Sequence, residues 1–153
     1  MTAPPGLRYR VATPGDVAAL LQVRTAVQEN HLSLQQLRAR GITPATLAEA
    51  LTSDTPCAWL AEVEAEVVGF SMVDLDDASL FALFVLPAHE GRDIGSHLLA
   101  EAERALFAVH PSAWLETAAS SRAAALYRAR GWGDEEPVGD RDVRLHKARP
   151  PRA

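Results

Sequence analysis

The sequence predicts an α/β (α+β) fold with a mixed, mostly antiparallel central sheet of about seven strands, flanked by about four helices. Strand-like and helical stretches alternate in the order β-α-α-β-β-β-α-β-α-β-β. This order combines hairpins, which pair strands antiparallel, with helical crossovers, which pair them parallel. The 153 residues show no internal repeat and no long linker, so we expect a single domain over 1–153 with flexible ends at about 1–6 and 148–153.

The first third of the chain predicts a strand and two helices. Residues 7–11 form a short strand candidate. Thr13 is then suited to cap a helix and Pro14 to its first position, because proline tolerates the first helical turn. The segment 43–51 opens with the same Thr-Pro pair and predicts a second helix.

The middle of the chain changes to strand patterns. Residues 58–63 and 67–74 are strand-like and are separated by a short polar segment, which predicts a hairpin without the usual Asn-Gly turn. Residues 79–85 are nearly all apolar, as in a strand that is buried on both faces.

The last third alternates helices and strands. Apolar residues recur with helical spacing over 94–109, and a short strand candidate follows at 113–117. A helix is expected over 122–130, ended by a glycine. The stretches 132–136 and 142–146 are expected to complete the sheet.

Composition excludes several classes of protein. The net charge is −5 and the basic residues form no stripe, which argues against nucleic-acid binding. Cys57 is the only cysteine, so no disulfide forms within the chain, and the histidines lack recognisable metal-ligand spacing. There is no apolar run of membrane-spanning length and no secretory signal pattern at the start. We therefore expect a cytoplasmic protein without a metal.

The most informative segment, 83–96, is predicted to run from a buried strand through a short loop into a helix. The first turn of a helix carries unpaired N–H groups and the positive end of the dipole, which suits a phosphate. Gly91 and Gly95 permit close backbone approach, and Arg92 adds positive charge. The alternative is an ordinary strand-to-helix turn.

The stretch Glu90-Gly-Arg-Asp-Ile-Gly-Ser96 resembles the pyrophosphate loop of the GNAT superfamily of N-acetyltransferases, Gln/Arg-x-x-Gly-x-Gly/Ala. The preceding Leu-Phe-Val-Leu-Pro is similar to the end of that superfamily's fourth strand. The resemblance implies acetyl-CoA as cosubstrate. Its pantetheine arm would pair with the strand end at Phe84, Val85 and Leu86. Its pyrophosphate would be held by the loop residues Gly91, Arg92, Asp93, Ile94, Gly95 and Ser96.

Two residues depart from this loop pattern. Glu90 stands where Gln or Arg is usual, and Asp93 stands where the first motif glycine is usual. A carboxylate beside the pyrophosphate would weaken binding by about 1 kcal/mol. Alternatively, Asp93 caps the helix by accepting the N–H of Gly95 or Ser96.

A second segment, 115–132, resembles the superfamily pattern Asn-x-x-Ala-x-x-Leu-Tyr-x-x-x-Gly-Phe. Ser120 takes the place of Asn, Ala123 that of the small residue and Tyr127 that of Tyr, which implies that all three contact the cofactor. The family's Tyr is the general acid for the CoA thiolate, a role that a phenol with a pKa near 10 can fill. The alternative for Tyr127 is a packed helix tyrosine.

An amine acceptor also needs a base and a pocket. Glu116, near the end of a strand, is the first candidate for the general base. Glu29 and His31 lie in a region that often lines the acceptor pocket in this superfamily, so they are the candidates for substrate binding. The alternatives are an outward-facing strand carboxylate and a solvated helix end.

The resulting expectation is an N-acetyltransferase that moves the acetyl group of acetyl-CoA directly to a primary amine of a small molecule, peptide or protein. The resemblance also allows a homodimer. Two alternatives involve no turnover: a CoA-binding sensor, and a degenerate interaction domain.

Overall fold

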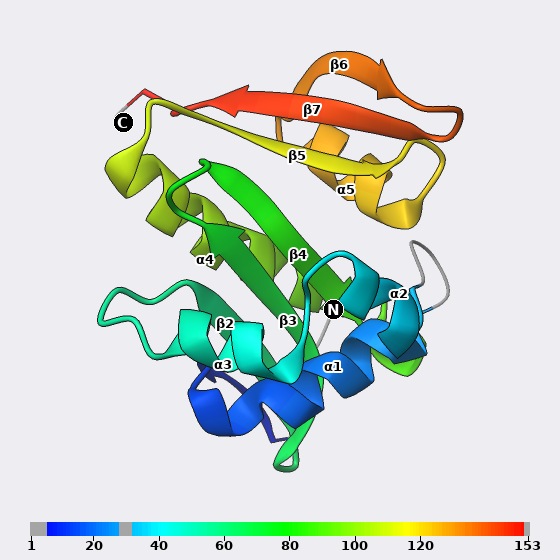
Figure 1. Ribbon diagram of the computed structural model, residues 1–153. Helices are drawn as coiled ribbons and strands as arrows, with labels where there is room; N and C mark the ends of the chain where they lie inside the picture. The colour runs from blue at the N-terminus through cyan, green and yellow to red at the C-terminus, as the bar shows by residue number, and fades with distance from the viewer. Residues whose placement is uncertain (1–5, 28–31, 152–153) are drawn as a thin grey trace.

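The sheet has seven strands, as seen in a computed structural model that describes residues 6–27 and 32–151. Their spatial order is β1-β2-β3-β4-β5-β7-β6, and the β4–β5 pair is parallel whereas the other neighbours are antiparallel (Figure 1). The strands are β1 (Leu7–Val11), β2 (Ala58–Val63), β3 (Glu66–Asp74), β4 (Ser79–Val85), β5 (Ser112–Ala118), β6 (Gly133–Val138) and β7 (Asp142–Ala148). The predicted mixed, mostly antiparallel sheet is confirmed.

The described residues form five α-helices, one more than the sequence predicts. They are α1 (Val17–Ala26), α2 (Leu34–Ala39), α3 (Pro44–Leu51), α4 (Ile94–Val109) and α5 (Arg122–Ala129), with short 3-10 turns at Pro14–Asp16 and Pro87–His89. The additional helix is α2, which has only six residues. A capping box starts it: the N–H of Gln36 donates to the Ser33 hydroxyl at 3.2 Å, and the Gln36 side chain accepts the Ser33 N–H at 2.8 Å.

The helices form two layers with the sheet between them (Figure 1). Helices α4 and α5 share one core cluster with β5 and β7, which includes Leu98, Leu115 and Tyr127. Helices α1, α2 and α3 share the second cluster, which includes Leu20 and Phe70. Strand β4 therefore contributes side chains to both layers, as its nearly continuous apolar sequence predicts.

The β2–β3 hairpin turns through Glu64 and Ala65, whose φ angles are 52° and 69°. Two successive residues with positive φ are typical of a type I′ turn, which matches the twist of the flanking strands. The predicted hairpin is thus present without the glycine that usually marks it.

Strands β4 and β5 diverge after their first contact. Their parallel pairing contains one register pair, Ser79 with Trp114. The Trp114 backbone N–H donates to the carbonyl of Ala78 at 3.0 Å, and its indole N–H donates to that of Asp77 at 2.9 Å. Beyond this junction the two strands splay apart (Figure 1). Within residues 6–27 and 32–151, no strand pairs with this edge of β4 beyond Ser79.

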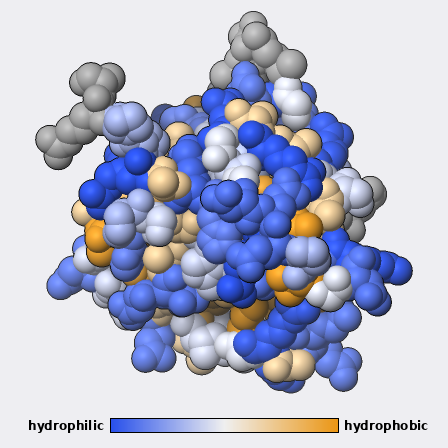
Figure 2. Space-filling model, turned by 90° about the horizontal axis from the view of Figure 1, so that it is seen from above, coloured by the Kyte–Doolittle hydropathy of each residue, from blue (hydrophilic) through white to orange (hydrophobic). Residues whose placement is uncertain are grey.

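The molecular surface is mainly polar. Figure 2, which views the β6–β7 end from above, shows a predominantly hydrophilic face with apolar residues in small separate patches. Among the described helices, none combines the length and apolar character needed to cross a bilayer.

Candidate active site

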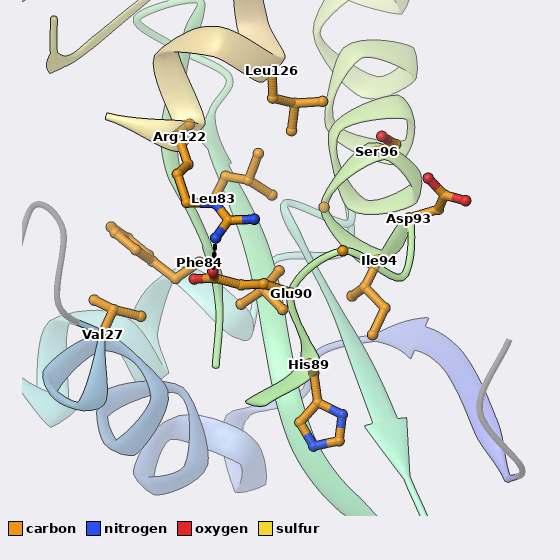
Figure 3. Close-up of a pocket in the computed structure, with 14 residues that line it drawn as sticks. Val27, Leu83, Phe84, His89, Glu90, Asp93, Ile94, Ser96, Arg122 and Leu126 are labelled. Atoms are coloured by element: carbon orange, nitrogen blue, oxygen red, sulfur yellow. Dashed lines mark ion pairs between the residues drawn. The ribbon is translucent and has the colours of Figure 1, made fainter. Parts of the chain in front are cut away.

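A cavity of about 290 Å³ lies where β4 leaves β5. The end of β4, the loop after it, the first turn of α4 and the N-terminal part of α5 build it, together with Val27 at the end of α1 (Figure 3). Its lining residues are Val27, Leu83, Phe84, Val85, His89, Glu90, Gly91, Asp93, Ile94, Gly95, Ser96, Arg122, Ala123 and Leu126. The two segments singled out in the sequence therefore meet at one cavity.

Most of the predicted cofactor-binding residues line this cavity. They are Phe84, Val85, Gly91, Asp93, Ile94, Gly95, Ser96 and Ala123. Leu86, Arg92, Ser120 and Tyr127 are described but are not among the lining residues. The hydroxyl that caps α5 belongs to Ser121, which accepts the N–H of Ala124 at 3.0 Å.

The two glycines of the loop have different surroundings. Gly91 has φ +77°, and a side chain built on it would meet nothing within 4 Å, so the loop backbone is open to a ligand. A Cβ on Gly95 would lie 3.5 Å from Leu126 and 3.9 Å from Val85. Both distances are ordinary van der Waals contacts, so Gly95 lies where α4 packs against β4 and α5, and this packing would admit a small side chain.

Asp93 precedes α4 in the left-handed backbone region, with φ 62° and ψ 12°. Glycine, asparagine and aspartate are the residues best tolerated there, which explains how aspartate replaces a motif glycine. Its side chain makes no capping hydrogen bond, so the predicted alternative of an Asp93 cap is wrong. Capping side chains normally extend from the β region, and the left-handed backbone turns this carboxylate away from the cavity (Figure 3).

An ion pair crosses the cavity between the loop and α5. The Glu90 carboxylate and the Arg122 guanidinium are 2.9 Å apart (Figure 3), with 34% and 71% of their side-chain surfaces exposed. The pair holds the guanidinium beside the loop where the resemblance places a pyrophosphate. Sequence reasoning did not select Arg122, although it immediately precedes Ala123 of the second motif.

Tyr127 is buried in the core shared by α4 and α5, with 5% of its surface exposed. Its ring meets that of Trp132 edge-on, with centroids 6.3 Å apart. Burial raises the pKa of Tyr127 above its ordinary value, because the phenolate is disfavoured away from water. The residue is therefore protonated at neutral pH.

Glu116 lies on β5 directly opposite Arg144 of β7. Its Oε2 accepts hydrogen bonds from Nη2 and Nε of Arg144, at 2.7 and 3.0 Å. The Arg144 guanidinium also stacks over the Trp114 ring at 4.2 Å. The predicted base is thus engaged in a cross-strand ion pair on the β5 side of the divergence.

Several residues of the site carry no clear sequence signal. Val27, Leu83 and Leu126 line the cavity as apolar wall residues. His89 also lines it, and among the described residues its buried Nδ1 has no hydrogen-bond partner. The predicted acceptor residues Glu29 and His31 lie outside the described residues. Within the described part of the chain, no His, Cys, Asp and Glu side chains gather into a group suited to a metal ion.

The chain is similar to one described protein family and to several solved structures. A family model described as the acetyltransferase (GNAT) family matches residues 22–132. No curated protein matches the chain. Among solved structures, the PaiA N-acetyltransferase of Thermoplasma acidophilum in complex with coenzyme A is similar with a TM-score of 0.74 and 16% identity, over 94% of this chain and 99% of that one.

Two further solved structures have related descriptions. The ribosomal-protein-S18-alanine N-acetyltransferase of Escherichia coli has a TM-score of 0.68 and 21% identity, over 93% of each chain. The ribosomal-protein-alanine N-acetyltransferase of Brucella melitensis has a TM-score of 0.68 and 26% identity, over 92% of this chain and 99% of that one. These likenesses show a common fold.

Proposed function

Because this chain belongs to the acetyltransferase (GNAT) family, we propose that it is a single-domain N-acetyltransferase that uses acetyl-CoA and a primary amine. The amine belongs to a small molecule, a peptide or a protein. The observation that carries the proposal is the 290 Å³ cavity, where an unpaired strand edge and a helix N-terminus converge. Membership of this family supports acetyl transfer in general, whereas the primary amine as acceptor is our proposal.

The residues present suit acetyl-CoA. The β4 edge at Phe84 and Val85 offers backbone groups to the amide-containing pantetheine arm, and Leu86 extends it. The pyrophosphate would lie against the loop from Gly91 to Ser96, where helix N–H groups and the dipole favour an anion. The open space above Gly91 leaves room for it. In this proposal Arg92, Ser120 and Ala123 complete the binding site.

Acetyl-CoA, when bound, supplies an acetyl group that is activated as a thioester. Backbone N–H groups at the β4 edge would stabilise the negative charge that develops on the carbonyl oxygen. Tyr127 would hold its proton at the hydroxyl oxygen and donate it to the departing sulfur. Burial raises the pKa of this hydroxyl, which keeps it protonated at neutral pH but also makes it a weaker acid than an exposed phenol.

The acceptor side of the proposal rests on three residues. Glu116 is the proposed base that takes a proton from the ammonium form of the acceptor, and its pairing with Arg144 would have to loosen for this. Glu29 and His31 are the proposed acceptor-binding residues. The names of two structural neighbours, which are alanine N-acetyltransferases, support an amine acceptor by analogy of fold.

One observation favours the alternative of a CoA-binding sensor without turnover. Tyr127 is buried and is not among the residues that line the cavity. If its hydroxyl does not reach the thioester sulfur, the chain would bind acetyl-CoA without catalysing acetyl transfer. The alternative therefore expects acetyl-CoA binding with no acetylation of any amine.

The decisive experiment is titration calorimetry of the full chain with acetyl-CoA, with adenosine as the control, followed by an assay of CoA release with a panel of amines. We expect binding that requires the pyrophosphate, and turnover with at least one amine. Binding without turnover across the panel would support the sensor instead. No binding at millimolar acetyl-CoA would overturn both readings.

Tyr127→Phe then tests the assigned acid. We expect kcat to fall about 100-fold, the typical contribution of a general acid, while the Kd for acetyl-CoA stays within about 2-fold. Tyr9→Phe is the matched control, because Tyr9 stacks on His97 with ring centroids 3.6 Å apart and does not line the cavity. Equal losses of kcat and affinity in Tyr127→Phe would assign Tyr127 a structural role.

A further inference from the structure

A second cavity, of about 120 Å³, lies on the opposite side of β4, between the sheet and the helices α1, α2 and α3. Its floor is formed by members of the second core cluster: Leu20, Leu21, Leu37, Leu47, Phe70, Met72 and Ala82. Phe81 of β4 also lines it and is 46% exposed, so the cavity communicates with solvent along the strand. An apolar group fits this floor.

Two arginines are the polar part of the lining. All described residues that line the cavity are apolar except Arg24, on α1, and Arg40, which follows α2. Burial lowers the pKa of Arg24 to about 10, and the positive charge of Arg40 contributes to the shift. Two guanidinium groups that line the same apolar cavity make a favourable place for an anionic group.

Phe84 connects this cavity to the cofactor cavity. The Arg24 guanidinium lies over the Phe84 ring, 4.1 Å from its centroid. Phe84 lines the cofactor cavity, and Ala82 and Phe81, earlier on the same strand, line the second one. The two cavities are therefore neighbours along β4, with the Arg24–Phe84 contact at their boundary.

We propose that the second cavity is the acceptor pocket and that the acceptor is a small aliphatic amine carrying a carboxylate, such as an aliphatic amino acid. This inference rests on the proposed N-acetyltransferase function. The carboxylate would pair with the guanidiniums of Arg24 and Arg40, whose planar donor sets match it. The aliphatic body would lie on the apolar floor, and the amine would face the β4 edge.

Cavity size limits the aliphatic body. An apolar cavity of roughly 150 Å³ accommodates benzene. The present cavity, at about 120 Å³, therefore suits one branched aliphatic side chain and not a folded peptide segment. Leucine is thus a suitable probe, and leucinamide and isopentylamine are its counterparts without the carboxylate.

The test measures kcat/KM for the three probes at saturating acetyl-CoA. We expect leucine to exceed leucinamide and isopentylamine by at least about 10-fold, the usual scale of a charge-assisted hydrogen bond that is lost. Arg24→Gln and Arg40→Gln should each reduce the ratio of leucine to leucinamide toward one. Arg38→Gln is the matched control, because Arg38 is an exposed residue of α2 that does not line the cavity, and the ratio should keep its wild-type value.

A binding measurement separates this inference from the proposed function. Leucine and leucinamide are titrated by calorimetry into the full chain in the presence of CoA. Selective leucine binding that depends on Arg24 and Arg40, without turnover, would uphold the pocket and refute the enzyme. Turnover of leucinamide or isopentylamine equal to that of leucine would overturn the pocket and leave the enzyme standing. Loss of leucine binding in Arg38→Gln to the same degree would also overturn it.

Discussion

The Asp93→Asn variant removes one negative charge at the loop proposed to bind the cofactor and keeps a residue type that tolerates the left-handed backbone. The carboxylate points away from the cavity, across the first turn of α4 (Figure 3). For an order-of-magnitude estimate we assume a separation of ~10 Å, about the width of a helix, between this carboxylate and a bound pyrophosphate. In water its repulsion with two phosphate charges amounts to ~0.8 kcal/mol, or about 4-fold in Kd.

Salt should reduce this effect. At physiological ionic strength the Debye length is about 8 Å, and screening over the same separation leaves ~0.2 kcal/mol, or about 1.5-fold in Kd. Calorimetry with acetyl-CoA should thus show a tightening of about 2- to 4-fold in Asp93→Asn at low salt, and of less than about 2-fold at physiological salt.

The Asp93→Ala variant separates the effect of the carboxylate charge from the effect of the left-handed backbone. It also removes the carboxylate but places an ordinary side chain in the left-handed region, which costs about 1 kcal/mol of unfolding free energy in a urea titration. A tightening of 10-fold or more in Asp93→Asn at physiological salt would refute the orientation argued here, because it requires a carboxylate facing the phosphates. Weaker binding would show that Asp93 assists the cofactor.

Three other perturbations test the site and its scaffold. If Glu116 is the base, Glu116→Gln should lower kcat about 100-fold and alter the pH profile of kcat. Turnover within about 2-fold of wild type would mean that Glu116 serves only in its ion pair with Arg144. Glu90→Gln removes the ion pair with Arg122 and takes a carboxylate out of the cavity, so calorimetry should show acetyl-CoA affinity rising a few-fold; weaker binding would mean that the ion pair orders the loop. Hydrogen bonds from Arg10 lower the pKa of Asp16 to about 2, so the pair contributes stability above pH ~4 that disappears as the pH falls toward 2. Urea titrations should therefore show that Arg10→Gln costs about 1 kcal/mol at pH 7, allowing for solvent exposure, and only a small part of this at pH 2; an equal cost at both values would contradict this linkage.

Local patterns predicted most of the fold. The Thr-Pro pairs placed helices that begin at or just after Pro14 and Pro44, and the apolar run 79–85 corresponds to β4 residue for residue. These signals are local because caps, proline geometry and side-chain periodicity act within a few residues. The six-residue α2 was missed because a helix of that length lacks a readable period, although Ser33 and Gln36 form its capping box.

The sequence by itself indicated the family, the loop that we propose holds the cofactor, and the composition of the β4 edge, since all three depend on short contiguous motifs. Only the tertiary structure decided which long-range neighbours complete them: Arg122 beside Glu90, Arg144 on Glu116, and Arg24 over Phe84. It also showed that Asp93 turns its carboxylate away from the cavity (Figure 3). These features depend on how strands splay and helices pack, and packing joins residues that are distant in the chain and share no local pattern.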